Sequence, residues 1–100
     1  MTRKATWYYI VRHSYTDNED VSNSYFNHKE KEEALRRANG YMNLCIENLC
    51  NNYRMGSHVK GVHTQVYQLF FAESFDGGKT YVEELLEEKR ASEFLGNHAV

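Results

Sequence analysis

The stretch from Asn27 to Tyr53 limits the fold of this chain more than any other segment. At about 100° per residue, its apolar side chains fall on one half of a helical wheel, and most of its charged and amide side chains fall on the other. The apolar half comprises Ala34, Leu35, Ala38, Tyr41, Met42, Cys45, Ile46, Leu49 and Tyr53. This pattern predicts one long amphipathic helix. Because such a helix is seldom stable alone in water, it needs a flat apolar surface to cover its stripe.

Both ends of this helix carry sequence signals. We expect Asn27 to cap the first turn, with Glu30 three residues later completing a capping box. Gly56 is a typical stop residue, so the helix should end near Arg54. Gly40 lowers the helix propensity in the middle, which indicates a bend or a close backbone contact at that position.

Four segments outside the helix have the residue types and alternation of strands. They are residues 6–15, 21–26, 62–75 and 80 to about 85. In the first segment, the odd-numbered residues from Trp7 to Tyr15 share one face and the even-numbered residues share the other. Turn-forming residues join the strands in pairs, at 16–20 and at 76–79. A short helix is expected from about Glu87 to Leu95.

These elements predict an α+β fold. An antiparallel sheet of about four strands, made of two hairpins, should pack on the long amphipathic helix, with a short C-terminal helix after the last strand. The 100 residues are expected to form one domain over positions 1–100. A sheet of this size leaves one face or edge open, and a partner would bind there.

Charge and hydropathy argue against several classes of protein. A formal charge of −2 and a pI near 6.2 argue against a partner held mainly through neutralised phosphates. The sequence has no apolar run long enough to span a bilayer, and its first residues do not resemble a signal peptide. We therefore expect a cytoplasmic protein with no membrane contact, in which two reduced cysteines lie in or beside the core.

Two cysteines and two histidines resemble a compressed zinc site. They are Cys45, Cys50, His58 and His63. Both cysteines would be helical and about 140° apart around the helix axis, too far to share one tetrahedral ion. We therefore expect no metal and no other cofactor.

The signals for catalysis are equally indirect. His13, beside Arg12 and Tyr15, resembles the sheet-borne sites of small ribonuclease toxins, but the sequence implies neither an orienting partner nor a substrate pocket. Residues 78–80 resemble the end of a phosphate-binding loop, yet Glu73 stands where its first glycine would be. We expect a hairpin turn there and no enzymatic activity.

The C-terminal part of the chain is acidic. Residues 73–100 carry seven acids and three bases, whereas residues 1–72 carry seven acids and nine bases. We expect this surface to dock on a basic groove of a nucleic-acid-handling protein, because complementary charge speeds encounter and fixes register. The predicted partner-binding residues are Glu73, Asp76, Glu83, Glu84, Glu87, Glu88 and Tyr81. The simpler interpretation is a solvated strand and helix surface.

The N-terminal half resembles a known group of proteins. Its order is a strand WYYIVRHSY, a turn, a short strand, and FNHKEKEEALRRA opening a helix. This order resembles that of many short accessory proteins of phages and mobile elements, including some anti-CRISPR proteins. The resemblance implies a non-enzymatic inhibitor or adaptor that occupies a site on a host nuclease or CRISPR effector complex. Anti-CRISPR proteins share no common motif, so no binding residue carries over.

Other hypotheses stay open beside the inhibitor. A small nucleic-acid-binding regulator would use the basic residues Arg3, Lys4, Arg12, Arg36, Arg37 and Arg54. Its binding to DNA or RNA would weaken as the salt concentration rises, whereas an inhibitor of proteins is expected to show no binding to nucleic acid. A third hypothesis is a metal or ribonuclease site at the cysteines and histidines named above. An uncovered strand edge could also pair across a two-fold axis and give a homodimer.

Overall fold

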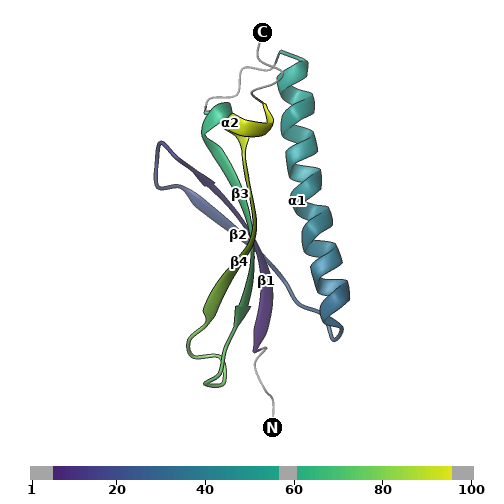
Figure 1. The fold of residues 1–100 in the computed structure, drawn as a ribbon, viewed down its shortest axis with the longest axis vertical. Coiled ribbons are helices and arrows are strands. Elements are labelled where there is room, and N and C mark those ends of the chain that lie inside the picture. Colours follow the sequence, from purple (N-terminus) through teal and green to yellow (C-terminus); the bar gives the residue numbers. More distant parts are fainter. Residues whose placement is uncertain (1–5, 57–60, 96–100) are drawn as a thin grey trace.

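A computed structural model describes residues 6–56 and 61–95 of the chain (Figure 1). The described elements are β1 (Trp7–Tyr15), β2 (Val21–Phe26), α1 (Lys31–Arg54), the 3-10 helix η1 (Val62–Thr64), β3 (Gln65–Glu73), β4 (Val82–Arg90) and α2 (Ala91–Phe94). The strands form one antiparallel sheet in the order β2-β1-β3-β4. This arrangement confirms the predicted α+β fold, and it places β1 and β3 at the centre of the sheet.

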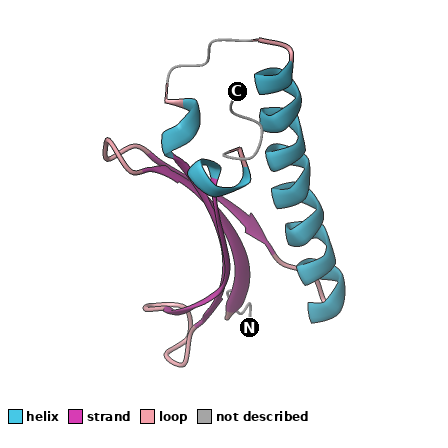
Figure 2. Cartoon of the chain, turned by 45° about the horizontal axis from the view of Figure 1, so that its top comes forward, coloured by secondary structure: helices cyan, strands magenta, loops and turns pink. Residues whose placement is uncertain are grey.

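The helix and the sheet form two layers. The core between them contains Val11 and Leu69 from the sheet and Ala38 and Met42 from α1, while Leu95 closes one end. Figure 2 shows that the sheet bends, with the β1–β2 and β3–β4 turns both on the side away from α1. The face that is not packed on the helix is therefore concave.

The strand register assigns each side chain to one face of the sheet. In β1, the odd-numbered residues share one face, as predicted, and they point toward α1, because Val11 is opposite Leu69 and both belong to the core. Even-numbered β1 residues, such as Ile10 opposite Phe70, lie on the other face. This alternation divides every strand into a helix-facing side and an open side.

The predicted start of the long helix was wrong. The helix begins at Lys31, and its N-cap is Glu30 without a side-chain capping bond. The Asn27 side-chain amide instead donates to the Trp7 carbonyl oxygen at 2.9 Å, and the His28 Nδ1 atom accepts from the Glu30 amide at 3.1 Å. Through these bonds, residues 27–30 form the connection between the sheet and the helix. The C-terminal end near Arg54 is confirmed, with Gly56 at a φ of 78°.

The start of β3 and the C-terminal elements also differ from their predicted bounds. Residues 62–64 form η1, and the strand begins only at Gln65. At the other end, residues 87–90 continue β4 where a helix was expected, because they pair with residues 66–69 of β3. A register shift in β4 opposite the Leu69/Phe70 step leaves Leu86 as an extra residue, a β-bulge.

Candidate functional site

The open face of the sheet lies outside the helix–sheet core. By the register it carries Tyr8, Ile10 and Arg12 from β1, Asn23 and Tyr25 from β2, Gln68 and Phe70 from β3, and Glu83, Leu85, Glu88 and Arg90 from β4. Figures 1 and 2 show both described α-helices on the opposite side of the sheet. Tyr25 and Leu85 are 61% and 47% exposed on this face.

Aromatic rings cross one end of the open face. The Tyr8 ring lies between Tyr25 on β2 and Tyr81 just before β4, with centroid distances of 5.8 and 5.7 Å. Tyr81 has a raised pKa because it is desolvated and lies beside the Tyr8 hydroxyl. The next row of paired residues is apolar, with Ile10 opposite Phe70 and Phe70 opposite Leu85. Neighbouring side chains cover Ile10 so well that it is only 4% exposed.

Arg12 extends across this apolar row. Its Nε donates to Asn23 Oδ1 at 2.7 Å, and its two terminal nitrogens donate to the Glu83 carboxylate at 3.1 and 3.0 Å. The guanidinium also lies 4.5 Å from the Phe70 ring centroid. A bidentate arginine–carboxylate pair and a cation–π contact fix this side chain and neutralise its charge.

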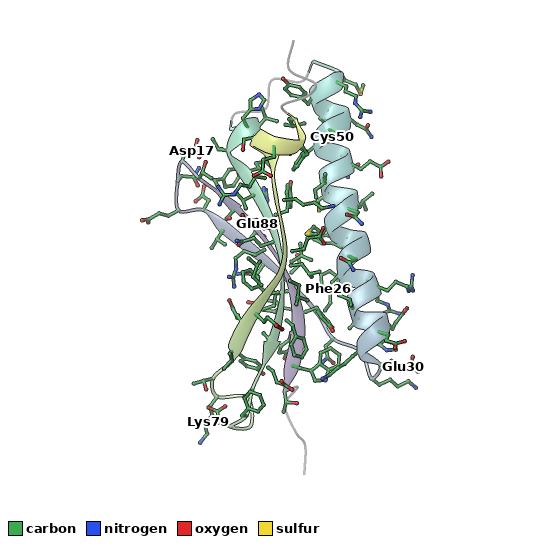
Figure 3. All side chains as sticks on the ribbon, viewed as in Figure 1. Asp17, Phe26, Glu30, Cys50, Lys79 and Glu88 are labelled. Carbon is green, nitrogen blue, oxygen red and sulfur yellow. The ribbon has the colours of Figure 1, made fainter. Side chains whose placement is uncertain are left out.

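The second arginine of the open face is paired as well. Arg90 Nε donates to Glu88 at 2.9 Å, and Gln68 Nε2 donates to the same carboxylate at 2.7 Å. The hydrogen bond from Arg90 is the main cause that lowers the pKa of Glu88, and the bond from Gln68 adds to it. The Glu88 carboxylate in turn raises the pKa of Arg90. Figure 3 shows Glu88 on the side of the sheet away from α1 and Phe26 on the side toward it. The open face therefore offers aromatic and aliphatic side chains among polar groups whose charges are already balanced.

The structure separates the acidic residues that the sequence grouped as a partner-binding set. Glu83, Glu88 and Tyr81 lie on the open face, with Glu83 opposite Ala72 and Glu88 opposite Gln68. Three others lie on the helix-facing side, where Glu73 is opposite Trp7, Glu84 is opposite Phe71 and Glu87 is opposite Leu69. Glu87 also pairs with Lys89 at 3.4 Å.

Asp76 belongs to neither face, because it organises the β3–β4 turn. Its Oδ1 accepts from the Lys79 and Thr80 amides at 3.0 and 2.9 Å and from the Ser74 hydroxyl at 2.7 Å. Its Oδ2 accepts from the Thr80 hydroxyl at 2.6 Å. These bonds, led by those from Thr80, hold the pKa of Asp76 well below its usual range. Gly77 and Gly78 supply the positive φ values of the turn, 78° and 93°.

Sequence reasoning placed Tyr8, Ile10 and Arg12 on one face of a strand but did not select that face as a site. Nothing in the first strand shows which of its two sides the helix will cover, since both contain large apolar residues. The second strand does not decide it either. Its open-face residues Val21 and Tyr25 are apolar, whereas Ser22 and Ser24 on the helix-facing side are polar, which is the reverse of the usual alternation.

In the ribonuclease hypothesis, His13 and Tyr15 lie on the helix-facing side of the sheet, whereas Arg12 lies on the open face. His13 Nε2 is 2.8 Å from Gln65 Oε1, to which the Tyr67 hydroxyl also donates at 3.0 Å. The His13 and Tyr67 rings stack at 4.6 Å beside a cavity of about 70 Å³. Burial raises the pKa of Tyr67 to about 12.

Both cysteines are partly buried in α1, which continues past them to Arg54. The His63 ring packs against Tyr53 at 5.4 Å, and His58 lies outside the described residues. Within the described ranges, no group of three His, Cys, Asp or Glu side chains could hold a metal ion.

The bases of the nucleic-acid hypothesis are not gathered on one surface. Arg12 is on the open face, whereas Arg36 and Arg37 are exposed on α1 and both pair with Glu33, whose pKa falls to about 2, mainly through the bond from Arg36. Arg54 is at the end of α1, and Arg3 and Lys4 lie outside the described residues. No helix in the described part of the chain has both the length and the apolarity that crossing a bilayer demands.

Comparison of the chain with protein-family models, with curated proteins and with solved structures finds no match.

Proposed function

We propose that this protein is a non-enzymatic, protein-binding inhibitor or adaptor that captures its partner on the open face of the sheet. The observation that carries this proposal is the uncovered concave face itself, where Tyr25 and Leu85 are exposed beside Tyr8, Phe70 and Tyr81. Aromatic and aliphatic groups in such a setting are typical anchors of protein interfaces.

The polar groups of the open face favour a protein partner over nucleic acid. Arg12 is bound by Glu83, and Arg90 is bound by Glu88, so both arginines of this face are paired with a carboxylate of the same face. Nucleic-acid platforms need unpaired cations to neutralise phosphates beside their stacking rings. A preorganised network of this kind can instead form the polar rim around an apolar contact without the cost of ordering loose side chains.

The partner that fits this surface has an apolar projection flanked by basic residues. The apolar row ending in Leu85 would receive the projection, and the carboxylates of Glu83 and Glu88 would face the basic groups. The resemblance of the N-terminal half to anti-CRISPR proteins suggests a nuclease complex of the host as that partner. A nucleic-acid-handling protein commonly carries such a basic groove.

The experiment compares two charged substitutions on the same strand. Leu85→Lys alters the open face, and Val82→Lys alters a residue that is 66% exposed on the helix-facing side. Tagged full-length variants are used to capture proteins from a lysate of the native host, and the captured proteins are quantified by mass spectrometry. We expect Leu85→Lys to reduce capture of the specific partner by about tenfold or more, as for loss of an interface anchor.

Val82→Lys is expected to capture as well as the unmodified chain. Equal capture by Leu85→Lys and the unmodified chain, with both folded by circular dichroism, would remove the open face from the proposal. A salt-dependent gel shift on DNA or RNA would instead favour the alternative function, a small nucleic-acid-binding regulator.

A further inference from the structure

The two edges of the sheet are protected to very different degrees. β4 forms one edge and contains four glutamates and the bulge at Leu86, which are features that hinder pairing with another strand. β2 forms the other edge, and its six residues, VSNSYF, include no charged side chain, no proline and no bulge. An edge strand exposes alternate backbone N–H and C=O groups, so β2 is open to pairing.

We propose that two copies of this chain pair through β2 about a two-fold axis perpendicular to the sheet, forming one antiparallel sheet of eight strands (2 × 4). This inference goes beyond the proposed function, because it concerns pairing along the β2 edge, although Tyr25 belongs both to that edge and to the open face. The axis places both α1 helices on one side of the joined sheet and both open faces on the other. The dimer therefore presents two copies of the candidate site side by side.

The exposed apolar residues of β2 select the register. A two-fold axis of this kind pairs residues of the same face, so it must pass midway between one residue and the same residue of the other copy. An axis at Asn23 places Val21 of each copy opposite Tyr25 of the other, and these side chains are 56% and 61% exposed in one chain. Ser22 and Ser24 then face each other on the helix-facing side, where small side chains allow close approach.

Charged residues flank β2 on both sides. The segment before it contains Asp17, Glu19 and Asp20, and the segment after it contains Lys29 and Glu30. Antiparallel pairing about Asn23 brings the first segment of one copy beside the second segment of the other, with Asp17 toward Lys29. This occurs twice in the dimer. The two Asn23 residues lie on either side of the axis, where their side-chain amides can hydrogen-bond to each other.

The test uses the full-length chain in sedimentation equilibrium over a range of concentrations. We expect the unmodified chain to form a dimer. In V21K/Y25K, lysine is opposite lysine at both pairs, so the dissociation constant should rise by about tenfold or more. In V21K/Y25E, lysine is opposite glutamate, and dimerisation should recover. The two variants differ at one position and both lose the Tyr25 contact with Tyr8, so the comparison isolates pairing between copies.

Leu86→Lys on β4 serves as the control at the opposite edge, and it should leave the dimer unchanged. A monomer at all concentrations of the unmodified chain would overturn the proposal. Equal dissociation of V21K/Y25K and V21K/Y25E, with both folded by circular dichroism, would also overturn it. So would loss of the dimer in Leu86→Lys, because that result would place the interface on β4.

Discussion

At the scale of single residues, acidic side chains that are close in the sequence have different structural roles. Glu83 and Glu88 neutralise arginines on the open face, whereas Asp76 binds the amides and hydroxyls of its own turn. An acidic run in the sequence therefore does not become one acidic surface. The alternation of side chains along β4 places its acids on both faces of the sheet, and hydrogen bonds within the turn engage Asp76.

Asp76 makes the β3–β4 turn dependent on pH. Its pKa is lowered in the folded state, so its ionised form stabilises the fold above the ordinary pKa of an aspartate, ~4, and that contribution is lost as pH falls through the lowered folded pKa. We expect Asp76→Asn to lower the melting temperature at pH 7 by a few degrees. The difference from the unmodified chain should shrink in acid and disappear below the folded pKa. A difference that stays constant from neutral pH into strong acid would show that the charge of Asp76 does not stabilise the turn.

At the scale of elements, α1 tolerates a glycine that it does not need. A bend or a close backbone contact was expected at Gly40, and the close contact is wrong, because a Cβ built at this position meets no atom within 4 Å. We expect Gly40→Ala to raise the free energy of unfolding by about 0.5–1 kcal/mol, since alanine loses less backbone entropy in a helix. The matched control is Gly56→Ala at the end of the same helix, where a φ of 78° disfavours any side chain and the substitution should destabilise the protein. Chemical denaturation of both variants measures the two effects, and a destabilised Gly40→Ala would contradict the prediction.

The elements that were predicted well are those whose side chains alternate or repeat strongly. The apolar stripe of α1 and the alternation from Trp7 to Tyr15 both result from burial on one side, so they can be read from the order of apolar and polar residues. The end of β4 was missed because its glutamates and lysine suit a helix equally well, and only pairing with β3 keeps them extended. The start of α1 was missed because Asn27 finds a better partner in the Trp7 carbonyl, which lies far away in the sequence. An open face or edge was expected, but the residues that form it were not assigned, because which face the helix covers is a property of the assembled layers.

At the scale of the whole molecule, the protein is long and thin. Its Cα radius of gyration is 15.7 Å and its extents are 57 × 27 × 18 Å, whereas a compact chain of this length has a radius of gyration of about 13 Å. Two layers with one open face produce this shape. The largest side chains that are fully buried among the described residues are Met42 and Leu95. A core this small makes each large buried side chain important, and it leaves much surface for a protein partner or a second copy to cover.

One small core shared by two layers should unfold as a unit. Met42 is fully buried between α1 and the sheet, so Met42→Ala should lower the free energy of unfolding by about 2–5 kcal/mol, a large part of the total for a domain of this size. Leu44→Ala, two residues away and 54% exposed, is the control and should change it by less than about 0.5 kcal/mol. The single tryptophan, Trp7, is in β1, and its fluorescence therefore reports on the sheet. It packs on Phe71 and on Lys31 at the start of α1, roughly 16 Å along the helix axis from Met42. Its fluorescence and the helical circular dichroism should lose their signals at the same denaturant concentration in both variants. If Met42→Ala shifted the helix transition and left the Trp7 transition in place, the sheet would be stable without α1, and the packing of the helix would not be what holds the open face in shape.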